Sequence, residues 1–286
     1  MKWHHQLEKR FDIEGQLILE TGLHCGSALP SGSTNAGVIR DAFGYPVLPG
    51  SSLKGAMRSR VAALAHGITE TPCCHMVKTR DLLRLKNNKW QQPDRCLSTY
   101  QDGAAWIQEH VGDGAKPLSI ESLSTKLCAI CKLFGGASWR AAVTFDDLIL
   151  DLESLPITEV RDGVGLDRDS RLAVPGVKYN FESLPPGTRF HFRCSAENLD
   201  DEGEALLAAG ILELCNGHLP LGGKVTRGLG SVSLDAKSLN IARTDFTDVD
   251  DCLRFFRGDL APEDPNPPIA KLQQHIDQVT GRHHAA

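Results

Sequence analysis

Two amphipathic helices, each preceded by a strand-like run, limit the folds that this sequence can adopt. The apolar residues of the first helix recur at spacings of four, four and three, which places them on one helix face: Leu53, Met57, Val61 and Leu64. Ser51 or Ser52 can cap this helix, and Gly67 can end it. The second helix is predicted over residues 201–216, with acidic residues at its N-terminus, where the helix dipole favours them. Its apolar stripe includes Leu206, Ile211 and Leu214.

Runs of alternating apolar residues predict strands over 11–26, 142–151, 188–195 and 231–234. The clearest alternation is in the third run, where Phe190 follows an arginine and precedes a histidine. In chain order the elements are strand, helix, strand, strand, helix, strand, which is the order of a split βαβ, ferredoxin-like unit. The predicted class is therefore α+β, with a modified ferredoxin-like (RRM-like) fold.

The predicted core consists of two stretches, residues 1–67 and 128–250. Residues 68–127 between them are polar and show little periodicity, so we interpret them as an inserted region. Residues 251–286 are interpreted as a C-terminal linker, rich in proline, followed by a tail with a short helix.

The insertion and the segment after it contain a cysteine cluster that predicts a metal site. Cys128 and Cys131 have the CxxC spacing of zinc knuckles and ribbons. Four further candidate ligands lie upstream: Cys73, Cys74, His75 and Cys96. One tetrahedral Zn²⁺ needs four ligands, and the preferred set is Cys73 or Cys74 with Cys96, Cys128 and Cys131, with His75 in reserve. Such a site would be structural and would supply folding energy to the zinc-binding insertion.

The alternative for any of the nine cysteines is simple core packing. We expect that role for the four that are isolated among apolar neighbours: Cys25, Cys194, Cys215 and Cys252.

Composition and charge restrict the function. The formal net charge is −5, whereas a free nucleic-acid binder usually has a basic footprint. Composition alone therefore favours no nucleic-acid role, and any RNA contact must be confined to a basic groove.

No stretch approaches the roughly 18 consecutive apolar residues of a membrane span, and the start of the chain lacks the apolar segment of a signal peptide. We expect a soluble, cytoplasmic protein with no membrane partner.

Two glycine-rich segments also contain cations. Residues 49–55 run into the first helix, where free backbone N–H groups favour a phosphate, and Lys54 and Arg58 add charge. Residues 222–230 combine glycines with Lys224 and Arg227. Either segment alone is more simply a tight turn. Together, at the start of the first helix and before the last strand, they indicate a cradle for a polyanionic strand.

Residues 48–58, Leu-Pro-Gly-Ser-Ser-Leu-Lys-Gly-Ala-Met-Arg, resemble the signature of the RAMP (repeat-associated mysterious protein) superfamily. They are similar in particular to the repeated (Cas-seven-type) backbone subunits of type III CRISPR effector complexes. Supporting matches occur in family order at residues 21–26, 38–41, 128–135, 165–168 and 222–230. The cysteine-bearing insertion resembles type III-D subunits, and a related type VII system is the alternative.

The resemblance implies a subunit that grips guide crRNA and displays it to target RNA. Its partners would be other copies of itself in a filament, other effector subunits and a separate nuclease. Residues 160–180 would form a thumb hairpin that interrupts the guide–target duplex. The implied RNA contacts are Ser51, Ser52, Lys54, Arg58, Arg40, Arg168, Lys224 and Arg227.

The same resemblance bears on catalysis. Target-cleaving relatives have an aspartate before a Val-x-Arg-Asp segment, and alignment of Val38 and Arg40 with that segment places Asn35 at the aspartate position. An amide has no charge with which to hold Mg²⁺ or Mn²⁺ or to take a proton. We therefore expect no intrinsic cleavage, with Asp41 or His24 as the fallback acid–base group if the chain is an active metal-dependent endoribonuclease.

Two rival functions remain open. One is a stand-alone endoribonuclease that processes precursor guide RNA, for which His24 and His191 are the candidate bases. The other is a zinc-stabilised adaptor with no RNA role.

Overall fold

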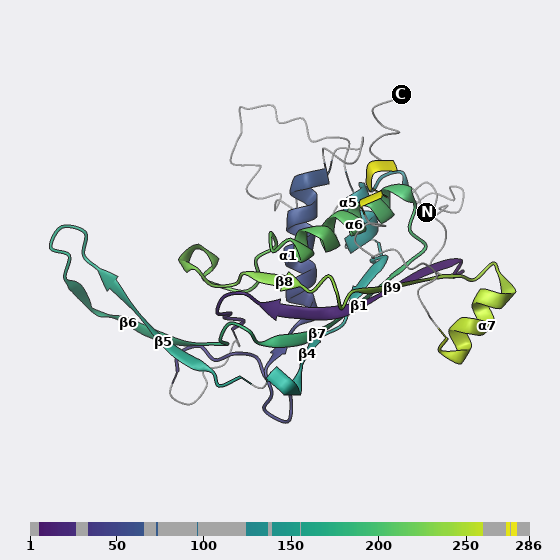
Figure 1. The fold of residues 1–286 in the computed structure, drawn as a ribbon. Coiled ribbons are helices and arrows are strands. Elements are labelled where there is room, and N and C mark those ends of the chain that lie inside the picture. The colour runs from purple at the N-terminus through teal and green to yellow at the C-terminus, as the bar shows by residue number, and fades with distance from the viewer. Residues whose placement is uncertain are drawn as a thin grey trace, which may run out of the picture.

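The computed structural model describes residues 6–26, 34–65, 73, 96, 124–136, 139–154, 156–259, 273–274 and 276–278. Within these residues an antiparallel sheet lies under three helices (Figure 1). None of the helices in these ranges is both long and apolar enough to cross a membrane.

The centre of the sheet has the strand order of a ferredoxin-like fold. The four strands, in spatial order, are β4 (Leu148–Leu150), β7 (Arg189–Glu197), β1 (Lys9–Leu19) and β8 (Val232–Leu234). Each pairs antiparallel with its neighbour, so β7 lies between β4 and β1. Three further strands extend this sheet: β2 (Val47–Leu48) beside β4, β3 (Val143–Phe145) beside β7, and β9 (Asn240–Asp245) beside β1. The predicted α+β topology is confirmed.

The helices α1 (Gly50–Leu64), α5 (Ala129–Phe134) and α6 (Asp201–Cys215) cover one face of the sheet (Figure 1). On β7, Phe190 and Phe192 are buried beneath them, and the alternate residues Arg189, His191 and Arg193 are exposed on the other face. The predicted stripes supply most of the expected core: Leu53, Met57, Val61, Leu206, Ile211 and Leu214 are buried. Leu64, the last residue of the first stripe, is half-buried. Gly210 lets α6 approach α1 closely, because a Cβ there would lie 2.9 Å from Met57 Cγ.

Three local predictions were wrong in detail. The first strand ends at Leu19 rather than at residue 26. The run 142–151 forms two strands, β3 and β4, separated by Asp146 and Asp147. Neither serine caps α1; its N-cap is Pro49, and the Gly50 N–H donates to Asp147 Oδ1 at 2.8 Å. The break between β3 and β4 thus places the carboxylate that satisfies the first turn of α1. Gly67, the predicted stop, lies outside the described residues.

The acidic start of the second helix is confirmed. Asp200 is the N-cap of α6 and accepts a hydrogen bond from the Gly203 N–H at 2.9 Å. Three acidic residues follow in the first turn, where the dipole stabilises negative charge.

Residues 159–183 form a two-stranded hairpin of β5 (Glu159–Leu166) and β6 (Ala173–Ser183), which projects away from the main sheet (Figure 1). Its register shifts between Val164 and Leu166. Two 3₁₀ turns complete the connections, Leu152–Ser154 and Val225–Arg227.

The sequence patterns did not indicate β9 or the helix α7 (Val249–Arg257) that follows it. Asp248 caps α7 and accepts from the N–H groups of Asp250 and Asp251. The predicted boundary at residue 250 therefore falls inside α7. Most of the predicted insertion and the predicted linker at 261–268 lie outside the described residues.

Candidate nucleic-acid interface and metal centre

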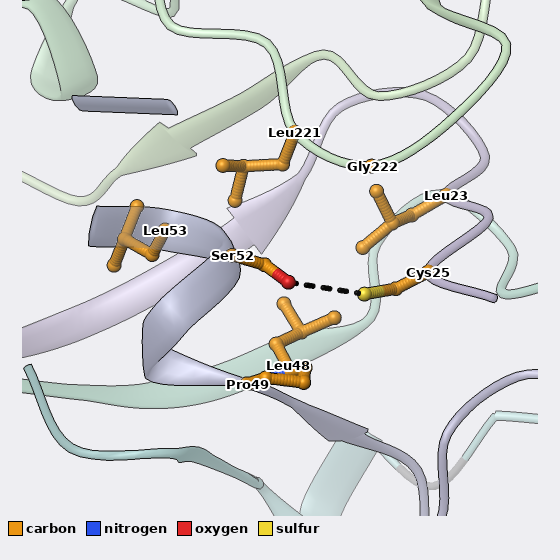
Figure 2. Close-up of a pocket in the computed structure, with 8 residues that line it drawn as sticks. All are labelled: Leu23, Cys25, Leu48, Pro49, Ser52, Leu53, Leu221 and Gly222. Carbon is orange, nitrogen blue, oxygen red and sulfur yellow. Dashed lines mark hydrogen bonds between the residues drawn. The ribbon is translucent and has the colours of Figure 1, made fainter. Parts of the chain in front are cut away.

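The first turn of α1 meets the glycine-rich loop at one point of the surface. Gly50 allows this placement, because a Cβ there would lie 2.4 Å from the Phe145 carbonyl oxygen. Ser51 and Ser52 are exposed, and Ser52 Oγ lies 3.9 Å from Cys25 Sγ. Figure 2 shows the small pocket at this junction, whose lining includes Leu23, Cys25, Ser52, Leu53, Leu221 and Gly222.

The glycine-rich loop closes onto the chain that follows β1. The Gly223 N–H donates to the His24 carbonyl and the Gly230 N–H donates to the Gly22 carbonyl, both at 2.8 Å. Gly230 has φ +85°, and a Cβ there would lie 2.2 Å from the Leu221 carbonyl oxygen. Only glycine fits this close backbone approach. The loop is therefore held at a defined position next to the start of α1.

Both cations of this loop contact the hairpin. Lys224 Nζ lies 4.8 Å from the centre of the Tyr179 ring and 4.4 Å from that of Phe181. The Arg227 guanidinium donates a hydrogen bond to the Tyr179 hydroxyl. Tyr179 in turn lies across Gly163 on the paired strand, where a Cβ would lie 2.3 Å from its Cζ. Lys224 and Arg227 thus line the junction between the glycine-rich loop and the base of the hairpin.

Glu182 connects the same junction to the predicted Val-x-Arg-Asp segment. Its side chain accepts from the Val38 N–H at 3.0 Å and lies 3.5 Å from an Arg40 nitrogen. Its backbone carbonyl lies 2.7 Å from His24 Nδ1, so His24 donates from Nδ1. His24 is nearly buried and packs edge-on against Phe181. These contacts hold the His24 ring against the hairpin base.

Of the candidate catalytic residues, Asn35 lies beside the hairpin. Asn35 is exposed, and its backbone N–H donates to Asn180 Oδ1 of the hairpin at 2.8 Å. The Asp41 carboxylate accepts from the N–H groups of Phe43 and Tyr45 at 2.9 Å each, so it holds a turn. His191 is exposed on the open face of the sheet, away from the helices.

The structure separates the other predicted RNA contacts from this junction. Lys54 Nζ donates to the Val143 carbonyl at 3.3 Å, and burial, with a contribution from the Arg58 charge, lowers the pKa of Lys54. The Arg58 guanidinium contacts α5. Arg168 is exposed at the hairpin turn, next to Asp167, whose carboxylate accepts from the Ser170 N–H and hydroxyl. Hydrogen bonding to Ser170 lowers the pKa of Asp167.

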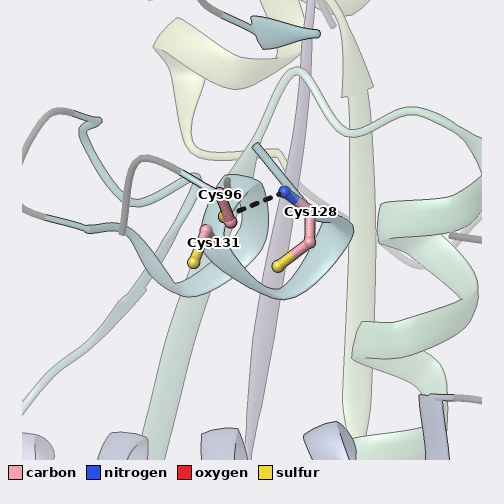
Figure 3. Close-up of side chains that lie close together, drawn as sticks. All are labelled: Cys96, Cys128 and Cys131. Atoms are coloured by element: carbon pink, nitrogen blue, oxygen red, sulfur yellow. Dashed lines mark hydrogen bonds between the residues drawn. The ribbon is translucent and has the colours of Figure 1, made fainter. Parts of the chain in front are cut away.

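Three of the six predicted metal ligands come together. The Sγ atoms of Cys96, Cys128 and Cys131 all lie within 4.8 Å of one another, and Figure 3 shows them at the start of α5. Cys128 is the N-cap of α5, and its N–H donates to Cys96 Sγ at 3.3 Å. Among the described residues, Cys73 packs against the core but does not join this group. Cys74 and His75 lie outside the described residues.

This donor set fits a zinc ion. Three thiols provide three of the four ligands of a structural tetrahedral site. An N–H donor to Cys96 Sγ and a guanidinium at Cys131 Sγ both stabilise negative sulfur. Two of the sulfurs belong to buried residues, Cys128 and Cys131, which excludes water from the group.

Two of the four isolated cysteines are buried in the core, as predicted, and the other two are half-buried. Cys25 and Cys194 are buried, and burial raises the pKa of both thiols. Cys215 and Cys252 are half-buried, and burial raises the pKa of Cys215 to about 11. All four are thiols rather than halves of a disulfide.

Sequence reasoning missed Tyr179, Phe181 and Glu182, which tie the hairpin to the glycine-rich loop and to the Val-x-Arg-Asp segment. The available signal was their alternation: Tyr179 and Phe181 are two residues apart, as expected for one face of a strand. Their partners in the glycine-rich loop are about 45 residues further along the chain, which no local pattern indicates.

Two comparisons with known proteins bear on this arrangement. The model of the RAMP superfamily matches residues 16–233. The chain is also 26% identical over 240 residues to the CRISPR system Cms endoribonuclease Csm3 of Methanocaldococcus jannaschii, and the match covers 79% of each protein.

Proposed function

The chain belongs to the RAMP superfamily, and on that premise we propose that it is a crRNA-binding backbone subunit of a type III-like CRISPR effector. The guide would lie along the junction between the first turn of α1, the glycine-rich loop and the hairpin base. The single observation that carries this proposal is that the glycine-rich loop contacts both of the other segments. Gly222 lines a pocket with Ser52 of α1, and Lys224 lies over the Tyr179 ring of the hairpin.

The chemistry of the junction suits a polynucleotide backbone. The solvent side of α1 carries only small residues near its start, Ser51, Ser52, Gly55 and Ser59, which leave room for close approach. Lys224 and Arg227 supply positive charge on the hairpin side of the junction. A local groove of this kind needs no basic body, which agrees with a net charge of −5. Guide pairing, rather than protein side chains, would then read the target sequence.

We propose that the hairpin β5–β6 is the thumb. It extends from the body (Figure 1), and six large apolar side chains are exposed on it among charged ones: Val160, Val164, Leu166, Leu172, Val174 and Val177. Apolar side chains can insert between bases and replace their stacking. Arg168 at the turn would contact a phosphate beyond the inserted side chains.

We propose zinc as the ion for the cluster of Cys96, Cys128 and Cys131, with a fourth ligand from Cys73, Cys74 or His75. Zinc, when bound, supplies a cross-link between the insertion and the start of α5. Its role would be structural, because α5 packs against α1 and α6 in the core.

We further propose that this chain does not itself cut the target. Asn35 has no carboxylate, and the Asp41 carboxylate is engaged in a turn. A separate nuclease among the effector subunits would then make the cut. The alternative is a Mg²⁺- or Mn²⁺-dependent target-RNA endoribonuclease, which the name of the archaeal relative, an endoribonuclease, favours.

The binding proposal is tested by purifying the chain from cells that contain a CRISPR array and sequencing the nucleic acid that accompanies it. We expect RNA of guide length with repeat-derived ends. RNA-free protein of uniform size would contradict the proposal and favour the adaptor.

The cleavage proposal is tested on the assembled complex with complementary RNA and Mg²⁺ or Mn²⁺. We expect no regularly spaced products from the native chain and a gain of cutting in Asn35→Asp. Regular products that disappear in Asp41→Ala would instead establish the endoribonuclease. Processing of repeat RNA by the isolated chain would favour the stand-alone enzyme.

A further inference from the structure

Arg58 contacts α5 at two points, and neither is on the solvent side of α1. Its Nη1 donates to the Gly135 carbonyl at 2.6 Å, and its Nη2 donates to Cys131 Sγ at 3.4 Å. Gly135 is the C-cap of α5, and Cys131 is in its first turn. One guanidinium therefore spans α5 from its cysteine-bearing start to its last carbonyl.

Lys54, one turn earlier on α1, points to the same side of the molecule. It donates to the Val143 carbonyl in β3, the strand that follows α5 in the chain. Because residues at i and i+4 share one helix face, Lys54 and Arg58 together define the face of α1 that meets the segment 131–143. The two cations of the glycine-rich loop contact the hairpin instead.

From these contacts we infer that Arg58 is a positioning residue of the metal centre rather than a ligand of guide phosphates. This inference rests on the proposed zinc site. Three thiolates concentrate negative charge in a partly buried place, and a guanidinium bonded to one of them offsets that charge. The same side chain fixes the middle of α1 to α5.

Arginine is suited to this role and lysine is not. The guanidinium is planar and has several fixed N–H donors, so it can bond a carbonyl and a sulfur at once. A lysine ammonium at the same position would keep the charge but is a compact donor that favours one of the two partners.

The test measures zinc affinity of the full-length chain by competition with a chromogenic chelator, together with the sulfur-to-metal absorption of the Co²⁺-substituted protein. We expect Arg58→Met to weaken zinc binding by about 10- to 100-fold, as is typical for the loss of a residue bonded to a metal ligand. The affinity of Arg58→Lys should fall between that of the wild type and that of Arg58→Met. Guide binding, measured with zinc saturating, should keep the salt dependence of the wild type.

The matched control is Arg60→Met, which removes a cation from the same helix. Arg60 pairs with Glu213 of α6 at 2.5 Å, on the side of α1 that faces α6 rather than the cysteine cluster. Its zinc affinity should stay within about twofold of the wild type. Circular dichroism shows whether each variant is folded, and Arg58→Lys provides the measurement if Arg58→Met does not fold.

The other outcomes distinguish failure of this inference from failure of the proposed zinc site. If the wild type binds zinc and Arg58→Met binds it equally well, the inference is wrong while the proposed zinc site stands. If the log–log salt slope of guide binding becomes shallower by about 0.7 in Arg58→Met, Arg58 is a phosphate ligand. If the wild type binds neither zinc nor Co²⁺, the zinc site and this inference both fall, and the guide-binding proposal is unaffected.

Discussion

The ammonium nitrogen of Lys224 lies 4.4 Å from the centre of the Phe181 ring, while the backbone of Lys224 is left-handed with φ +63°. A non-glycine residue in this conformation is uncommon, so the surrounding contacts must hold it there. The glycine-rich loop and the hairpin base are thus joined through one cation in a strained turn.

Lys224→Gly removes this cation and relieves the backbone conformation. We expect weaker guide binding and a salt slope that is shallower by about 0.7, because one phosphate contact with single-stranded RNA is lost. The measurement is guide affinity between about 50 and 200 mM salt. Lys237→Gln, on an exposed turn beyond β8, is the control and should change neither quantity. An unchanged slope in Lys224→Gly would remove Lys224 from the proposed interface.

Two glycines near the start of α1 should respond in opposite ways to alanine. A Cβ at Gly50 would meet the Phe145 carbonyl at 2.4 Å, whereas Gly55 has no atom within 4 Å of that position among the described residues. Gly50→Ala should lower the free energy of unfolding by about 1–3 kcal/mol through overpacking. Gly55→Ala should raise it by about 0.5–1 kcal/mol through helix propensity. Urea denaturation measures both, and equal effects would contradict the packing described at Gly50.

Burial of Lys54 should leave a signature in the pH dependence of stability. Its pKa in the folded chain is lower than the ordinary lysine value of 10.5, so the folded state binds this proton less tightly than the unfolded state does. The resulting cost to stability is fully present below the lowered pKa and disappears as the pH rises toward 10.5. Relative to Lys54→Met, the wild type should therefore gain stability as the pH rises from below the lowered pKa toward 10.5. Parallel stability curves for the two proteins would show that Lys54 is solvated.

Removal of zinc should destabilise the whole fold, because α5 belongs to the core. With free zinc about 1,000-fold above its Kd, binding contributes about 4 kcal/mol, which corresponds to on the order of 10 °C in Tm for a chain of this size. Calorimetry with and without a chelator measures this change. Cys131→Ser should abolish the effect of the chelator, and Cys194→Ser, at a buried cysteine outside the cluster, should leave it intact. A Tm that does not respond to the chelator would argue against a structural metal.

The strand and helix order and the apolar stripes were predictable from the sequence, because each depends on local periodicity. Leu53, Met57 and Val61 had to share a face, and Phe190 had to point away from Arg189. The CxxC pair was equally predictable, since one turn of chain brings its two thiols together. Composition also separates residues 160–179 from the core, whereas the register in which β5 pairs with β6 is visible only in the structure.

Tertiary structure decided what the charged residues do. Periodicity places Lys54 and Arg58 off the apolar stripe, but such residues can face either solvent or a neighbouring element, and here the segment 131–143 supplies carbonyls and a sulfur for them. The same holds for Asp147, whose carboxylate accepts from the Gly50 N–H of α1 nearly 100 residues away in the chain. The partners of Lys224 are likewise distant in the chain. Hydrogen bonds and cation–π contacts of this kind depend on where the elements pack, and local sequence patterns do not contain that information.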